Sequence, residues 1–107
     1  MSPGKIVAQA GHAFLGTFLQ CRDTALIDAY HRDFPASPGT KICLRVPNLD
    51  QLLDTERQAL NAGIAMFRVV DSGCLNFFGG HPIITALGLG PVTELKGRPI
   101  LGKFRLL

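Results

Sequence analysis

The fold class is decided by residues 41–71, KICLRVPNLDQLLDTERQALNAGIAMFRVVD. Apolar and polar residues alternate over 41–46, which predicts a strand that Pro47 ends. Leucines at helical spacing follow, and 66–71 is again typical of a strand. Two strands joined by a helix form a right-handed parallel unit. The sequence therefore predicts an α/β domain.

Local signals mark both ends of the helix in this unit. Asn48 lies three residues before Gln51, as in a capping box, and Gly63 stands where a left-handed C-cap is expected. The leucines that we expect the helix to bury are Leu49, Leu52, Leu53 and Leu60.

Residues 4–20 predict another helix, which Ser2 or Gly4 would cap. Its apolar face consists of Val7, Ala10, Phe14 and Phe18. Its opposite, polar face carries Lys5, Gln9 and His12, which fall within about 60° of each other because offsets of four and seven residues return to one stripe. This helix is expected to lie with its polar stripe away from the core.

The remaining segments complete one domain. In chain order, they are a continued or separate helix (24–30), a loop (31–40), a glycine-containing loop (72–82), a strand (83–89) broken by Gly90-Pro91, a short helix (92–96) and a last strand (100–107). We expect residues 1–107 to form a single domain with three layers, in which helices flank a small mixed β-sheet.

Composition bounds the function classes. The chain has 47% hydrophobic and 18% charged residues, which excludes intrinsic disorder. Its net charge of +3 permits a nucleic-acid partner and fits equally a surface tuned for solubility. No apolar run approaches the roughly 20 residues that a membrane span requires. The first residues lack the charged and then apolar pattern of a secretory signal. We expect a cytoplasmic protein with no membrane partner.

The cysteines and the missing motifs exclude several chemistries. Cys21, Cys43 and Cys74 form no C-x-x-C pair, so we expect thiols without a metal or a disulfide framework. No Walker loop, GxGxxG, HExxH or GxSxG occurs, which argues against nucleotide hydrolases, dinucleotide enzymes, zinc proteases and α/β-hydrolases.

A candidate site combines the end of one strand with the polar helix stripe. Asp71 ends the 66–71 strand, and ligands of open α/β sheets bind outside the carboxyl ends of strands. His12 would take a proton from water near neutral pH, and Asp71 would orient it. Lys5, in the first helical turn, would bind a phosphate or stabilise an oxyanion. Each residue also has a structural alternative to this catalytic role. Asp71 would cap a helix or form a turn, and His12 would simply be packed or solvated.

Four segments resemble one known family, the archaeal and eukaryotic type of peptidyl-tRNA hydrolase, often called type 2. The segment MSPGKIVAQAGHA (1–13) is similar to its helix signature, approximately GKxAAQxxHA. VDSG (70–73) is similar to its strand-end D-A-G, ALGLGP (86–91) to its strand with a G-P turn, and GKFRLL (102–107) to its closing segment. The resemblance spans the chain in one order.

The resemblance implies hydrolysis of the ester that joins a peptide to the 3′ ribose of tRNA, without a metal or cofactor. It places functional residues on Lys5, Gln9, His12 and Asp71. Further candidate substrate contacts lie in the loop after Asp71, namely Ser72, Gly73, Asn76 and His81. Candidate contacts to the tRNA backbone are Lys41, Arg45 and Arg68, whose alternative is a solvated strand face.

Two departures from the family pattern leave alternatives open. Leu75 stands where the family has a threonine implicated in catalysis, and leucine has no hydroxyl. Three explanations are open. Ser72 or His81 takes the place of the threonine, or the mechanism tolerates the loss of the threonine hydroxyl. Otherwise the protein is an inactive relative that binds tRNA or a protein.

The second departure is that the family has a central strand ahead of the helix signature, and this sequence starts where that strand should end. Three explanations are open: Met1 is not the natural start of the protein, a partner chain supplies the strand, or the sheet is reorganised. Unpaired strand edges invite association, so we expect a homo-oligomer.

Overall fold

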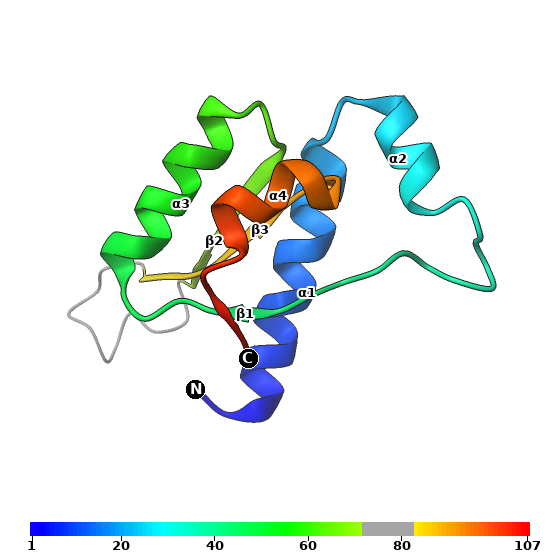
Figure 1. The fold of residues 1–107 in the computed structure, drawn as a ribbon. Helices are drawn as coiled ribbons and strands as arrows, with labels where there is room; N and C mark the ends of the chain where they lie inside the picture. The colour runs from blue at the N-terminus through cyan, green and yellow to red at the C-terminus, as the bar shows by residue number, and fades with distance from the viewer. Residues whose placement is uncertain (72–82) are drawn as a thin grey trace.

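The computed structural model describes residues 1–71 and 83–107 (Figure 1). The elements in chain order are α1 (Pro3–Gln20), α2 (Thr24–Tyr30), β1 (Leu44–Arg45), α3 (Leu49–Asn61), β2 (Met66–Asp71), β3 (Ile83–Leu89), α4 (Glu94–Leu101) and β4 (Arg105–Leu106). In these described ranges, no helix is both long and apolar enough to cross a membrane.

Side-chain caps begin the first two helices. Ser2 Oγ accepts a hydrogen bond from the Lys5 amide at 3.3 Å, as expected, and Pro3 occupies the first turn of α1. Asp23 Oδ1 accepts a bond from the Leu26 amide at 3.0 Å. Residues 24–30 therefore form a separate helix rather than a continuation of α1.

The predicted boundaries of α3 are confirmed, but only part of its expected buried face is, since Leu52 and Leu53 are half-buried. Asn48 Oδ1 accepts a bond from the Gln51 amide at 2.9 Å, and Gly63 has a φ of 72°. Leu49 and Leu60, however, are exposed. The helix instead turns Thr55 and Ala59 inward, because small side chains on this face let α3 approach the sheet.

Strands β2 and β3 occupy the predicted ranges and pair with each other antiparallel. Their register joins Met66 to Leu89 and Asp71 to Ile83, with a bulge between Val69 and Val70. Strand β1 pairs antiparallel with β4, in a second two-stranded sheet. The expected parallel pairing within 41–71 is therefore wrong, and so is a mixed sheet for the described residues, because the C-terminal segment takes the edge of β1.

The layered α/β arrangement is confirmed. Helix α1 covers one face of β2 and β3, while α3 and α4 cover the other (Figure 1). The core on the second face consists of Ala59, Ile64 and Ile100, with Met66, Leu89, Val92 and Leu101 packed against them.

Glycines allow α1 to lie close to the sheet. A Cβ on Gly16 would stand 2.2 Å from Phe67 Cδ2, and one on Gly88 would stand 2.3 Å from the Ala13 carbonyl oxygen. The hydroxyl of Thr17 donates to the Gly90 carbonyl at 3.0 Å. Helix α1 therefore turns the stripe of Gln9, Ala13 and Thr17 toward the sheet.

This contact corrects the expected orientation of α1. Val7, expected on the packed face, is exposed, and Gln9, expected on the outer polar face, is buried. The physical reason is the close approach at Gly16 and Gly88, which favours small residues and one satisfied amide over large apolar side chains.

The C-terminal elements differ from their expected bounds. Thr93 caps α4, which runs to Leu101 and is longer than the short helix expected over 92–96. The predicted strand over 100–107 is reduced to β4, and the strand predicted over 41–46 is reduced to β1. Both short strands depend on each other for their hydrogen bonds.

Candidate functional site

An ion pair joins the start of α1 to the end of β2. Lys5 Nζ lies 3.0 Å from Asp71 Oδ2, and the two side chains are 43% and 10% exposed. The helix places Lys5 in its first turn, and the sheet places Asp71 at its carboxyl end. The result is a largely buried carboxylate that holds an ammonium group accessible to solvent.

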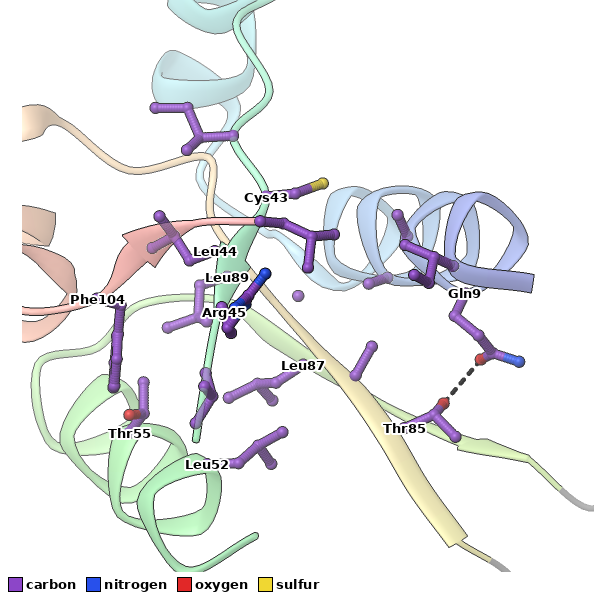
Figure 2. A pocket seen from close by; sticks show the side chains of 18 of the residues that line it. Gln9, Cys43, Leu44, Arg45, Leu52, Thr55, Thr85, Leu87, Leu89 and Phe104 are labelled. Carbon is purple, nitrogen blue, oxygen red and sulfur yellow. Dashed lines mark hydrogen bonds between the residues drawn. The ribbon is translucent and has the colours of Figure 1, made fainter. Parts of the chain in front are cut away.

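A second polar contact lies one turn further along α1. The Thr85 hydroxyl donates to Gln9 Oε1 at 2.7 Å (Figure 2), and Gln9 is 9% exposed. Thr85 lies on β3 beside the bulge, where its neighbours Ile84 and Ala86 pair with β2. Sequence analysis missed Thr85, although a hydroxyl residue in the otherwise apolar strand IITALGL was a usable signal.

His12 is exposed on α1. It lines a shallow hollow between α1 and β2, together with Leu15, Gly16, Phe67 and Val70. Within the described ranges, Asp71 pairs with Lys5, and no hydrogen bond joins it to His12. The structure thus brings Lys5 to Asp71 and leaves His12 open to an approaching molecule.

The loop candidates Ser72, Gly73, Asn76 and His81 lie outside the described residues, as does Leu75. Their roles stay predictions. The alternatives that Leu75 leaves open therefore have to be decided by activity.

The basic residues suggested for the tRNA backbone have different surroundings. Arg68 Nε donates to Glu56 Oε2 at 2.8 Å, which ties β2 to α3. This hydrogen bond lowers the pKa of Glu56, against the effect of partial burial. Lys41 donates to the carbonyl of Pro38 at 3.0 Å, and Arg45 lines a groove beside β3. The Arg68 side chain is thus paired with Glu56 of the same chain.

Residues 1–71 and 83–107 contain no group of three or more His, Cys, Asp or Glu side chains that would hold an ion.

The fold and the site define a class of protein. It is a small three-layer α/β protein in which a lysine ammonium group is held against a carboxylate at the end of a strand. The family described as Peptidyl-tRNA hydrolase PTH2 matches residues 1–107, and the chain belongs to this family.

Relatives in this family come from archaea and from a eukaryote. The chain is 35% identical over 107 residues to "Peptidyl-tRNA hydrolase" of Methanothermobacter thermautotrophicus, a match that covers 100% of this chain and 89% of the relative. It is 34% identical over 110 residues to the protein of that name from Sulfolobus acidocaldarius, covering 100% and 90%. It is 32% identical over 93 residues to "Probable peptidyl-tRNA hydrolase 2" of Dictyostelium discoideum, covering 85% and 42%.

Proposed function

We propose that this protein hydrolyses the ester bond between a peptide and the 3′ ribose of tRNA. The Lys5–Asp71 pair carries the proposal, since it places a positive charge at the strand end in a chain that matches the family over its whole length. The relatives' shared name, peptidyl-tRNA hydrolase, supports the same substrate.

The chemistry needs a water molecule and a site for negative charge. The water oxygen bonds to the ester carbonyl carbon, and the bond from that carbon to the ribose oxygen then breaks. One water proton passes to the ribose oxygen, so the products are a peptide acid and free tRNA. The Lys5 ammonium stabilises the oxyanion that develops on the carbonyl, and Asp71 fixes the position of Lys5.

His12 and Gln9 complete the proposed site. His12 accepts the proton from the attacking water, a role for which its exposure on α1 suits it. Thr85 fixes the amide group of Gln9, whose NH₂ has two hydrogens to donate. We assign one of these to an oxygen of the substrate.

Three finer points belong to the same proposal. The protein binds the tRNA portion of its substrate, acts in the cytoplasm and forms a homo-oligomer. The exposed apolar side chains Leu15 and Leu19 on α1 favour self-association. Sedimentation velocity over a range of concentrations measures the oligomeric state.

The test is release of labelled peptide from peptidyl-tRNA by the purified chain. We expect turnover that falls about 100-fold or more in Lys5→Ala and in His12→Ala. Lys96→Ala is the matched control, because it removes an exposed lysine from α4, on the other side of the sheet from α1.

The same assay decides against the alternative function. A folded chain that binds peptidyl-tRNA and releases nothing would be a binding module. Release by Leu75→Thr alone would then identify a decayed enzyme.

A further inference from the structure

The hollow between α1 and β2, here called the α1–β2 hollow, has a volume of about 580 Å³ and includes His12 in its lining. The rest of the lining is mainly apolar, with Leu15 and Leu19 from the helix and Phe67 and Val70 from the strand. Leu15 and Leu19 are 61% and 62% exposed, and Val70 is 48% exposed. Apolar surface next to the proposed base is therefore open to a ligand.

Helix α1 and strand β2 run in opposite directions along this hollow. The start of the helix meets the end of the strand in the Lys5–Asp71 ion pair. Further along the helix, Gly16 lies against the ring of Phe67, near the start of the strand. The near end of the hollow is therefore the histidine of the proposed site, and its far end is Arg22, just beyond α1.

The charge of the lining distinguishes between the two parts of a peptidyl-tRNA. The tRNA part carries a negative phosphate for each nucleotide and needs cations to bind it. Among the described residues, the lining includes one lysine or arginine, Arg22, and it stands at the far end. The apolar remainder gains free energy by covering apolar side chains. The α1–β2 hollow therefore fits the peptide part of the substrate rather than the RNA.

The edge of β2 beside the hollow favours an extended peptide. Strand β2 pairs with β3 along one edge, and no described segment pairs with its other edge. The described residues of β3 do not line the hollow, so the hollow lies on the outer side of β2. Backbone N–H and C=O groups at such an edge bind an extended peptide whatever its side chains are. Such an edge suits an enzyme whose substrates differ in peptide sequence.

We propose that the α1–β2 hollow binds the last residues of the substrate's peptide in extended form and selects apolar side chains among them. This inference rests on the proposed function. The helix advances about 10 Å from His12 to Leu19, which is the length of about three extended residues. The ester end of the peptide lies at His12 and its N-terminal end points toward Arg22, so the peptide runs parallel to β2.

The experiment measures kcat/KM for N-acetylated peptidyl-tRNAs that share one tRNA and one amino acid at the ester. Their peptides have two, three or four residues, with either leucine or glycine at every other position. Leucine at the second and at the third residue from the ester is expected to raise kcat/KM about fivefold each, because each side chain leaves water for the hollow. Leucine at the fourth residue is expected to add nothing, because it lies beyond the hollow.

Leu19→Ser tests the lining itself. Leu19 is exposed, so the fold does not depend on it, and its loss is expected to lower the ratio of leucine to glycine kcat/KM about fivefold. Val7→Ser is the matched control, because Val7 is an apolar residue of α1 that is 71% exposed and lies outside the lining. This control is expected to keep the ratio of the wild type. A wild type without a leucine preference would overturn the proposal, as would equal ratios in the wild type and Leu19→Ser.

Analogues that carry an amide in place of the ester separate this inference from the proposed function. Fluorescence anisotropy with labelled analogues gives a Kd for the leucine and the glycine peptides. A chain that releases no peptide but binds the leucine analogue more tightly would contradict the proposed reaction and support the hollow as a peptide site. A chain that hydrolyses both series with equal kcat/KM would support the reaction and overturn the hollow as a peptide site.

A second copy of the chain is the competing occupant, because Leu15 and Leu19 also favour self-association. Sedimentation velocity of the wild type and Leu19→Ser separates the two occupants. An oligomer that is lost in Leu19→Ser while the leucine preference stays unchanged would assign the hollow to a second copy and overturn the proposal. A leucine preference that falls in Leu19→Ser at a concentration where both chains sediment alike would support the peptide.

Discussion

Lys5 Nζ lies 3.0 Å from Asp71 Oδ2, so an ion pair ties the first turn of α1 to the last residue of β2. The ion pair connects helix α1 to strand β2, and Asp71 is the more buried of the two residues. The pair therefore sets the position of the Lys5 ammonium group in the proposed site.

Removal of the ion pair is expected to cost little stability and much activity. A double-mutant cycle of Lys5→Ala and Asp71→Asn should give a coupling free energy of about 0.5–1 kcal/mol, because Lys5 is solvent-accessible and the pair is screened. Urea denaturation at low and high salt measures it. A coupling that does not shrink at high salt would contradict this account.

Loss of the Thr85 hydroxyl is expected to destabilise the fold. Thr85→Val keeps the shape but removes the donor to the buried Gln9 Oε1, so the free energy of unfolding should fall by about 1–2 kcal/mol. Thr85→Ser retains the hydroxyl and is the control. Equal losses in the two variants would assign the effect to packing instead of the hydrogen bond.

Two glycines of α1 are expected to respond in opposite directions to the same substitution. Gly16→Ala places a Cβ against the Phe67 ring and should cost about 1–3 kcal/mol. Gly11→Ala meets nothing within 4 Å and should stabilise the helix by about 0.5–1 kcal/mol. Thermal unfolding of both variants checks the prediction, which fails if their Tm values shift alike.

The Glu56–Arg68 pair predicts a dependence of stability on pH. The hydrogen bond from Arg68 lowers the pKa of Glu56 from its ordinary value of 4.5. The stabilisation is therefore complete above pH 4.5 and disappears as pH falls through the lowered pKa. We expect Glu56→Gln to be less stable than wild type near neutral pH and to approach it in acid.

Urea unfolding at a series of pH values measures this difference. Arg57→Gln serves as a control, because Arg57 pairs with Asp54 on the same helix and not with the sheet. A gap between wild type and Glu56→Gln that stays constant down to the most acidic pH would contradict the assigned cause.

Much of the local structure was predictable because its signals lie within a few residues. Ser2 and Asn48 cap the helices that follow them, and Gly63 ends α3 with positive φ. Strands β2 and β3 have the bounds that their apolar runs predicted. Each of these features depends on hydrogen bonds or backbone angles of near neighbours.

The burial of individual side chains was less predictable. Helical spacing gave the correct period for α1, but it could not say which face meets the sheet. The close approach at Gly16 and Gly88 selected the face with Gln9 over the face with Val7. A periodic pattern defines faces, and only the neighbouring element decides which of them is covered.

The sequence by itself determined α1, α3 and the bounds of strands β2 and β3, and it singled out Lys5 and Asp71 as candidate site residues. Only the tertiary structure decided that Asp71 pairs with Lys5 rather than with His12, that Thr85 holds Gln9, and that β1 pairs with β4. The physical reason is distance along the chain. Caps and turns are selected by local geometry, whereas contacts between remote segments exist only when the whole domain packs, and the groove beside β3 arises only from that packing.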